Sequence, residues 1–390
     1  MPHQVTLTGN QAAAEAMRQI DPDVVAAYPI TPTTSIMEYF SEFVADGKVN
    51  TEFVPVESEH ASMSACVGAA AAGGRVMTAT ASQGLLLMSE VLYNASGLRL
   101  PIVLINGCRA VSAPLNIHGD HSDAYAVRDA GWIMLFAQNQ QETYDLTLQA
   151  IKISEHSNVR TPVMICIDGF MNTHTLANLQ IEDNLKVKKF IGEYKAINPL
   201  LDLKNPVSYG AADKPDFYTE HRRSQHEGLI NAPKIISETG KEFNKTFGRD
   251  YSKSFTSLGL QDAEYAIVAM GSLVNTIVAE VKCERAMGKK VGALSLKQYR
   301  PFPASEIRQA LQDKKAIAVI DRSTPAGAEF APLATEIRSA LSEFKNPPKI
   351  LPIIAGLGGR DLFTNEVEEI FKELAKLKKN AETKWVGLRE

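Results

Sequence analysis

Short apolar segments alternate with longer amphipathic segments between residues 5 and 167 of this chain. Such alternation is typical of a parallel sheet with helices on both faces, because each parallel strand needs a long crossover to reach the next. The first part of the chain is therefore expected to be a doubly wound α/β domain. The pattern predicts strands at residues 24–28, 52–56, 75–79, 102–105, 132–136 and 163–167, and helices that include 10–20, 84–93 and 141–156.

The alternation returns after residue 264 and predicts a second, smaller α/β domain. We place the boundary between residues 255 and 256, which gives the domains 1–255 and 256–390. A chain of 390 residues is long enough for two or three domains of ~100 to 200 residues. The expected strands are 265–270, 291–296, 316–320 and 350–354, and the expected helices are 274–287, 304–311, 330–344 and 366–377.

Residues 173–226, between these two patterns, are polar and contain several prolines. The segment is too long for an ordinary connection inside a compact domain. Two interpretations remain open. The segment is either an extension that wraps the surface or contacts a partner, or a loop that is exposed to solvent. A helix is expected at 232–247, where the chain leaves the first domain.

Composition argues against several classes of protein. Hydrophobic residues make up 45% and charged residues 22%, and the net charge of −4 comes without a long basic run, so nucleic acid is not an expected partner. Residues 1–16 lack the apolar core of a signal peptide, and no segment reaches the ~20 apolar residues of a membrane span, so we expect a cytoplasmic protein that does not bind membranes. The cysteines form no Cys-x-x-Cys pair, which argues against a disulfide framework, a zinc site or an iron–sulfur site in this chain. They are Cys66, Cys108, Cys166 and Cys283.

Residues 54–72 place two carboxylates, Glu57 and Glu59, between a β-branched strand and a helix made almost entirely of small residues. One interpretation is structural, because Ser58 is a suitable N-cap and acidic residues complement the first turn of a helix. However, Glu59 is followed by small apolar residues, and a carboxyl against an apolar wall can share a proton with a bound ring nitrogen. The second interpretation is therefore a cofactor site.

Polar residues also follow three other predicted strands. Two prolines in residues 28–34 disfavour helix at the residues before them and hold Thr31 extended. Residues 80–84 form a small polar turn before a Leu-rich helix, and Arg109 follows the strand at 102–105. Ligands of doubly wound sheets bind at the carboxyl ends of the strands. We therefore expect a hydroxyl, the Glu59 carboxyl, a polar turn and a guanidinium to converge there.

Two histidines and two aspartates lie within residues 116–123. Both residue types bind metals, but the segment has no helical i, i+4 histidine pair or other recognisable ligand spacing. We therefore prefer a hydrogen-bonded loop near the site and expect no metal site in this chain.

Several short segments resemble the α subunit of pyruvate:ferredoxin oxidoreductases, in the 2-oxoacid:ferredoxin oxidoreductase family. The first domain contributes Tyr-Pro-Ile-Thr-Pro at 28–32, Glu-Ser-Glu-His-Ala at 57–61, Thr-Ala-Ser-Gln-Gly at 80–84, Gly-Asp-His-Ser-Asp at 119–123 and Asp-Gly-Phe at 168–170. Arg-Pro-Phe-Pro at 300–303 and Ala-Gly-Leu-Gly-Gly at 355–359 extend the resemblance into the second domain. It covers nearly the whole chain in the same order, so it is far more specific than any single motif.

The resemblance implies a thiamine-diphosphate enzyme whose cofactor lies between two subunits. The first domain would be the pyrimidine-binding domain, and the second would resemble the transketolase C-terminal domain. Glu59 would be catalytic and would hydrogen-bond the aminopyrimidine ring, Thr31 would contact the substrate, and Arg109 would hold the substrate carboxylate. The residues implied to contact the cofactor are Glu59, Pro29, Ile30 and Gln83.

A glutamate at the aminopyrimidine favours the imino tautomer, whose nitrogen removes a weakly acidic ring proton of the cofactor. In this family, electrons would then pass to [4Fe-4S] clusters on partner subunits and to ferredoxin, and the acyl group to coenzyme A. This chain lacks the Gly-Asp-Gly run with which thiamine enzymes usually bind diphosphate and Mg2+. We therefore expect beta, gamma and delta-type partner subunits to supply the diphosphate site, the Mg2+ and the clusters.

The implied reaction is the reversible oxidative decarboxylation of pyruvate to acetyl-CoA and CO2. Alternative substrates are 2-oxoglutarate, a branched-chain 2-oxoacid and oxalate, but Thr31 and Arg109 suit one small carboxylate, and a second carboxylate would need another cation. An alternative of another class is a non-catalytic scaffold subunit, because a shared fold does not prove function. Loss of Glu59, Thr31 or Arg109 would mark such a scaffold, and all three are present.

Overall fold

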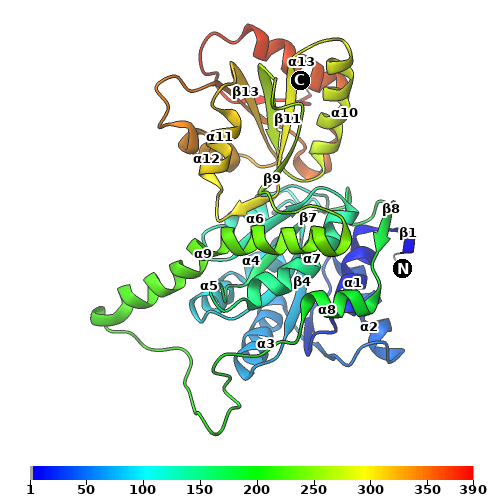
Figure 1. Ribbon diagram of the computed structural model, residues 1–390, viewed down its shortest axis with the longest axis vertical. Coiled ribbons are helices and arrows are strands. Elements are labelled where there is room, and N and C mark those ends of the chain that lie inside the picture. The colour runs from blue at the N-terminus through cyan, green and yellow to red at the C-terminus, as the bar shows by residue number, and fades with distance from the viewer. Residues whose placement is uncertain (1–2, 390) are drawn as a thin grey trace.

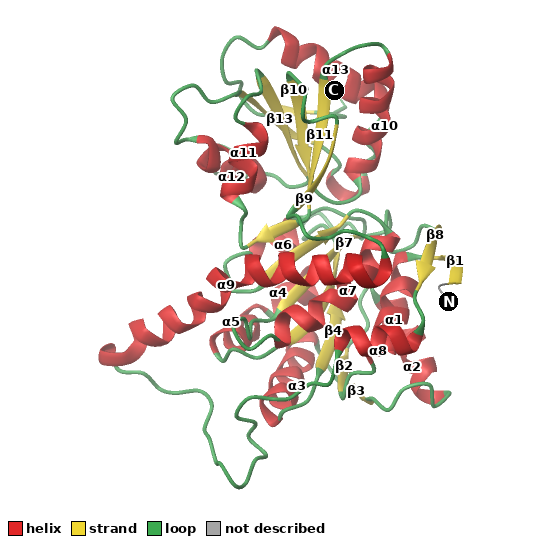
Figure 2. Ribbon diagram, in the orientation of Figure 1, coloured by secondary structure: helices red, strands yellow, loops and turns green. Residues whose placement is uncertain are grey.

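The computed structural model describes residues 3–389 and has two lobes, each built around its own sheet (Figures 1 and 2). Neighbouring strands of the first lobe's sheet run parallel, apart from one edge strand that comes from within the second lobe's part of the sequence and pairs antiparallel. In spatial order these strands are β12 (Gln298–Arg300), β6 (Ile133–Ala137), β7 (Val163–Asp168), β5 (Ile102–Cys108), β4 (Val76–Thr80), β2 (Val24–Ala27) and β3 (Glu52–Pro55).

Two layers of helices cover the first sheet, because successive side chains of a strand point to opposite faces. On β5, Val103 and Ile105 pack into one core and Leu104 into the other. The first core is covered by α1 (Gly9–Ile20), α2 (Thr34–Ala45), α7 (Gln140–Glu155), α8 (Asn184–Ile191) and α9 (Pro215–Phe247). The second is covered by α3 (Glu59–Ala72), α4 (Ser82–Leu87), α5 (Ser89–Gly97) and α6 (Ser122–Ala126).

The second lobe is also an α/β layer structure. Its strands, in spatial order, are β15 (Lys384–Trp385), β14 (Lys349–Ile354), β13 (Ala316–Asp321), β10 (Tyr265–Ala269), β11 (Val291–Leu296) and the antiparallel β9 (Phe255–Leu258). Its helices are α10 (Leu273–Ala286) and α13 (Thr364–Lys376) on one face, and α11 (Ala304–Leu311) and α12 (Pro332–Leu341) on the other.

The predicted strands are found with shifts of at most three residues at their ends, and so are most predicted helices. The helix expected at 84–93 is interrupted at Met88, which separates α4 from α5. The sequence pattern did not predict α2, α6, α8, β9, β12, β15, the 3-10 turn Leu357–Gly359 or the antiparallel pair β1 (His3–Leu7) and β8 (Ala177–Ile181). The last two strands lie far apart in sequence, so no local pattern identifies them as partners.

The segment 173–226 has two parts, one that packs on the first lobe and one that extends away from it. Residues 177–191 lie on the surface of the first lobe, where β8 pairs with β1 and α8 packs beside α1 and α7. The chain then leaves the body as a loop and returns as the first half of α9, which projects from the lobe in Figure 1.

A helix was predicted to begin at residue 232, after this segment. That start was wrong, because α9 begins at Pro215, within the segment. Residues 214–224 are all exposed, so this half of the helix has no apolar face for periodicity to reveal. Across residues 3–389, no helix combines the length and the apolar character that crossing a membrane requires.

Candidate functional site

Four neighbouring parallel strands, β5, β4, β2 and β3, end at one edge of the first sheet. Their following residues are those that the sequence singled out: Arg109 after β5, residues 80–84 at the end of β4, Thr31 after β2 and Glu59 after β3. The sheet topology therefore brings the expected residues to one edge.

Glu59 is the first residue of α3, and its side chain is only 7% exposed. The Ser58 hydroxyl caps the helix by accepting a hydrogen bond from the Ala61 N–H at 3.1 Å. Glu57, two residues earlier, is exposed, so the two carboxylates have different environments. Within residues 3–389, the Glu59 carboxylate has no hydrogen-bond or ion-pair partner. A helix cap needs only Ser58, which leaves the buried acid free for a ligand.

The turn after β4 lies in close contact with this carboxylate. A Cβ atom at Gly84 would lie 2.6 Å from Glu59 Oε1 and 2.5 Å from Thr80 Oγ1, so only glycine fits between them. Thr80 Oγ1 and Gln83 Nε2 are themselves buried without a hydrogen-bond partner. Unpartnered buried polar groups are uncommon in native proteins, and two of them beside the Glu59 carboxylate indicate a place for a polar ligand.

Asp123 connects this turn to Arg109. Asp123 Oδ2 accepts hydrogen bonds from the Ser82 N–H at 2.8 Å and the Arg109 N–H at 3.1 Å. Ser82 has a φ of 49°, a conformation rare for a residue with a side chain, and such strain is often found at functional sites. Burial raises the pKa of Asp123 to about 7, although these N–H groups act in the opposite direction. The sequence pattern predicted a polar loop that contains Asp123 but not this connecting role.

The Arg109 side chain is 8% exposed and is held by backbone carbonyls. Its Nη1 donates to the Thr31 carbonyl at 2.9 Å, and its Nε donates to the Asn116 carbonyl at 3.3 Å. In the described part of the chain it forms no salt bridge, and Asp120 instead accepts hydrogen bonds from Ser122. The guanidinium therefore keeps its charge and its remaining N–H groups available for an anion.

The other strand-end residues after β2 are more open. Thr31 and Pro29 are exposed and Ile30 is half-buried. The Ile30 carbonyl accepts hydrogen bonds from the backbone and side chain of Thr33, which fixes the turn. The Thr31 hydroxyl is thus presented at the surface while its carbonyl holds Arg109.

The loop at residues 116–123 is hydrogen-bonded, as predicted from the sequence. His121 Nε2 lies 2.8 Å from Asp168 Oδ1, His118 Nδ1 lies 3.2 Å from Asn116 Oδ1, and Asp120 pairs with Ser122. Its acidic and imidazole groups thus have separate partners. Among residues 3–389, no group of three His, Cys, Asp or Glu side chains is arranged to hold a metal ion.

Two family models match the chain. The model described as "Pyruvate flavodoxin/ferredoxin oxidoreductase, thiamine diP-bdg" matches residues 15–241, which is more than half of the chain and includes every strand-end residue above. The model described as "Pyruvate:ferredoxin oxidoreductase core domain II" matches residues 263–367. The chain belongs to the pyruvate:ferredoxin oxidoreductase family. The resemblance found in the sequence is therefore confirmed.

Curated relatives agree over the full length. The chain is 48% identical over 388 residues to the pyruvate synthase subunit PorA of Thermotoga maritima, covering 99% of this chain and 98% of the relative. It is 43% identical to the subunit of the same name from Methanocaldococcus jannaschii, covering 98% of each chain. It is 40% identical to the ketoisovalerate oxidoreductase subunit VorA of Pyrococcus horikoshii, covering 100% of this chain and 99% of the relative.

Solved structures match the fold of the oxidoreductase chain at low identity. A 2-oxoglutarate:ferredoxin oxidoreductase from Magnetococcus marinus superposes with a TM-score of 0.74 at 18% identity, covering 95% of this chain and 65% of that chain. A split-gene transketolase superposes with a TM-score of 0.58 at 13% identity, covering 96% and 99%. The expected fold, a thiamine-diphosphate-binding domain followed by a transketolase C-terminal-like domain, is confirmed.

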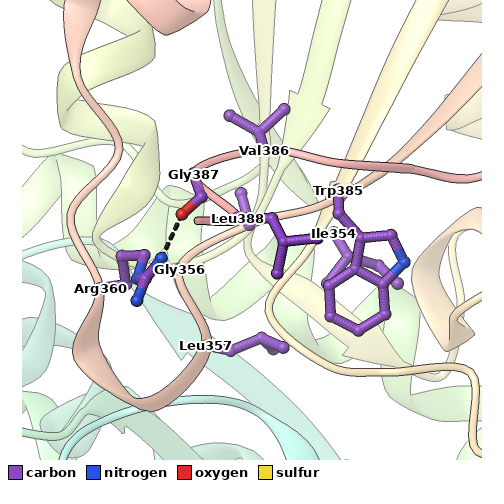
Figure 3. Close-up of a pocket in the computed structure, with 9 residues that line it drawn as sticks. Ile354, Gly356, Leu357, Arg360, Trp385, Val386, Gly387 and Leu388 are labelled. Carbon is purple, nitrogen blue, oxygen red and sulfur yellow. Dashed lines mark hydrogen bonds between the residues drawn. The ribbon is translucent and has the colours of Figure 1, made fainter. Parts of the chain in front are cut away.

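A separate hollow lies in the second lobe of the oxidoreductase chain (Figure 3). It is lined mainly by apolar residues, which are Ile354 at the end of β14, residues of the loop after it and the segment 385–388. Arg360 crosses its edge to donate a hydrogen bond to the Gly387 carbonyl. None of the strand-end residues lines it, so it is not part of the candidate site.

Gly84→Ala is expected to destabilise the chain, because the new Cβ would collide with Glu59 and Thr80. Overpacking of this kind typically costs about 1–3 kcal/mol, more than the ~1 kcal/mol that alanine gains over glycine in a helix. Gly97→Ala is the matched control, because Gly97 ends α5 with open space around its Cβ position. Urea-induced unfolding of both purified variants measures the difference. Equal stabilities would show that the turn does not press on Glu59.

Proposed function

We propose that this chain is the α subunit of a complex that catalyses the reversible, thiamine-diphosphate-dependent and coenzyme A-dependent oxidative decarboxylation of pyruvate to acetyl-CoA and CO2. Ferredoxin accepts the electrons. The observation that carries this proposal is the buried, unpartnered Glu59 carboxylate, which lies in the segment matched by the thiamine-binding family model. The proposed division between residues 255 and 256 makes the first part the pyrimidine-binding domain and the second the transketolase C-terminal-like domain.

The residues around Glu59 fit the aminopyrimidine end of thiamine diphosphate. The Glu59 carboxylate can accept a hydrogen bond from a protonated ring nitrogen, and the Gln83 amide nitrogen and the Thr80 hydroxyl offer further polar groups without protein partners. Pro29 and Ile30 border the same edge and complete the proposed cofactor-binding set. When bound, the cofactor supplies the electron sink for the electron pair that decarboxylation releases.

In this proposal Glu59 holds a proton at the nearby nitrogen of the aminopyrimidine ring. A carboxylate in a site with little water exerts a stronger influence on such a proton than it would in bulk solvent. Gly84 keeps this carboxylate in place, because its missing side chain leaves room for Oε1 beside the turn. The strained Ser82 turn and Asp123 link this position to the substrate-binding side.

Arg109 binds the substrate carboxylate in this proposal. A guanidinium has five N–H groups, and two of its nitrogens are already oriented by the Thr31 and Asn116 carbonyls. The remaining N–H groups can form paired hydrogen bonds that fix the plane of a carboxylate. The exposed Thr31 hydroxyl lies on the same loop as the carbonyl that holds Arg109, and it contacts the substrate beside it.

Partner subunits complete the site. The chain contains no Gly-Asp-Gly run for diphosphate and Mg2+ and no cysteine pattern for a cluster. We therefore assign the diphosphate site and Mg2+ to a beta-type subunit, the [4Fe-4S] clusters to partner subunits that include gamma and delta types, and the complex to the cytoplasm. The subunit names of the curated relatives support an assembly of several chains.

Pyruvate is the proposed substrate, because the strand-end residues supply one guanidinium and no second cation. This fits a 2-oxoacid with a single carboxylate and disfavours 2-oxoglutarate and oxalate. A branched-chain 2-oxoacid also has one carboxylate, and one relative is named as a ketoisovalerate oxidoreductase subunit at 40% identity. The 48% identity to a pyruvate synthase subunit favours pyruvate.

The test is an assay of the native complex, purified with its partner subunits. Reduction of ferredoxin or a viologen is measured with coenzyme A and a panel of pyruvate, 2-oxoisovalerate, 2-oxoglutarate and oxalate. We expect the highest kcat/KM with pyruvate and no reduction when coenzyme A is omitted. A preference for 2-oxoisovalerate would change the substrate, and no reaction with any 2-oxoacid would support the scaffold alternative.

A further inference from the structure

A buried ion pair joins the two lobes beside the candidate site. Arg322, directly after β13 in the second lobe, and Asp168, at the end of β7 in the first lobe, are each 1% exposed. Arg322 Nη1 lies 2.6 Å from Asp168 Oδ2 and 3.0 Å from the hydroxyl of Ser272. A buried ion pair is weak evidence of a stabilising role, because removing both charges from water is costly. Stabilisation alone therefore does not explain why this ion pair lies between the lobes.

Other groups of Arg322 hold the loop at residues 116–121, through contacts with Gly119 and His121. Arg322 Nη2 donates to the Gly119 carbonyl at 3.1 Å, and the Arg322 carbonyl accepts a hydrogen bond from the His121 N–H at 2.8 Å. His121 Nε2 in turn lies 2.8 Å from Asp168 Oδ1. The arginine thus binds the loop through both its side chain and its backbone. Its Nε donates to the Gly356 carbonyl at 3.1 Å, which fixes the guanidinium within the second lobe.

A second set of contacts holds the other part of this loop. Asn116 Nδ2 donates to the Gly358 carbonyl at 3.1 Å, and the Gly359 N–H donates to the Gly119 carbonyl at 2.8 Å. A Cβ at Gly358 would lie 2.3 Å from Asn116 Nδ2, so the two lobes approach closely at this point. The second lobe therefore fixes the loop at residue 116 as well as at residues 119–121.

The same loop orients Arg109. The Asn116 carbonyl accepts the hydrogen bond from Arg109 Nε at 3.3 Å, and the Ala110 N–H donates to the His118 carbonyl at 3.1 Å. Thr31 supplies the other carbonyl that binds the guanidinium. A loop that moved away from the second lobe would therefore leave Arg109 with one of its two side-chain contacts.

We propose that Arg322 is a positioning residue of the second lobe, which clamps residues 116–121 so that Arg109 presents its guanidinium to the substrate carboxylate. This inference rests on the proposed function, because it assigns Arg109 to the substrate. Asp168 keeps the Arg322 guanidinium in place. Although burial alone would raise the pKa of Asp168, Arg322 and His121 hold that pKa well below its ordinary value, so the carboxylate stays charged opposite the arginine.

Two variants of the complete complex separate this role from a general contribution to the contact between the lobes. Arg322→Lys keeps a positive charge near Asp168 but cannot reproduce the fork that also reaches Gly119 and Gly356. Asn275→Ala is the matched control, because Asn275 of the second lobe hydrogen-bonds Gln138 of the first lobe but contacts neither Arg322 nor the loop.

We expect Arg322→Lys to raise the KM for pyruvate roughly tenfold or more, with a smaller change in kcat, because a misplaced anchor weakens substrate alignment. The KM for coenzyme A should not change. Hydrogen–deuterium exchange of the complex should be faster at the Ala110 and His121 amides, whose acceptors lie in or hold the loop. Asn275→Ala should leave both the KM for pyruvate and the exchange of these amides at wild-type values.

Equal effects of the two variants, or an unchanged KM despite faster exchange, would overturn the positioning role. If Arg322→Lys does not assemble, Asn116→Ala tests the same clamp, because it removes the contact with Gly358 from a half-buried side chain. It is expected to give the same KM effect, and an unchanged KM would overturn the proposal. If the wild-type complex accepts no 2-oxoacid, the proposed function fails and amide exchange alone decides whether Arg322 holds the loop.

Discussion

Glu59→Gln is expected to leave the fold and the assembly of the complex unchanged and to lower turnover by ~10²- to 10⁴-fold. Glutamine has nearly the same shape, so it should fit between the start of α3 and Gly84. Its neutral amide cannot balance a proton on the cofactor's ring nitrogen, and that proton is what Glu59 holds in the proposed mechanism. The expected loss is therefore in kcat and in kcat/KM together, because the interaction is needed in the reaction step itself.

Glu57→Gln is the matched control for this experiment. It makes the same chemical change two residues earlier, at an exposed side chain, and should keep wild-type turnover. Steady-state assays of both complexes with saturating thiamine diphosphate and Mg2+ provide the measurement, and size-exclusion chromatography checks assembly. Wild-type turnover in Glu59→Gln would show that Glu59 is only a helix-start residue, as the structural interpretation holds.

Arg109 variants are expected to give the second large effect. Arg109→Lys should raise the KM for pyruvate with little change in kcat, because an ammonium supplies the charge but not two parallel hydrogen bonds. Arg109→Ala should also lower kcat, because the keto carbon is no longer directed at the reactive position of the cofactor. The loss of a charged hydrogen-bond partner corresponds to about 1.5–3 kcal/mol, or roughly 10- to 160-fold in kcat/KM.

The measurement is a steady-state assay with varied pyruvate. Arg128→Lys serves as the control, because Arg128 also donates to a backbone carbonyl, that of Tyr125, but lies after α6 and outside the strand-end site. Its KM for pyruvate should equal that of the wild type. If both Arg109 variants keep the wild-type kcat/KM, the substrate carboxylate binds elsewhere, and the choice of pyruvate loses its main residue-level support.

The candidate site was largely predictable because it depends on the order of strands. In a parallel sheet, polar residues that follow neighbouring strands meet at one edge, so Thr31, Glu59 and Arg109 could be grouped from the sequence. The hydrogen-bond partners that hold these residues could not be predicted from the sequence. Asp123 lies in a short polar segment whose local sequence shows no sign that one carboxylate oxygen will accept N–H groups from both Ser82 and Arg109.

The sequence by itself determined the alternation of strands and helices, the presence of two α/β units and the polar strand ends, because each depends on residues close together in the chain. The tertiary structure decided what depends on distant residues. It placed β12, which follows β11 of the second lobe, in the sheet of the first lobe, and it extended α9 outside the body, where no apolar periodicity marks a helix. It also brought Arg322 to Asp168 across 154 residues, and no local pattern encodes a contact that forms only when the two lobes pack together.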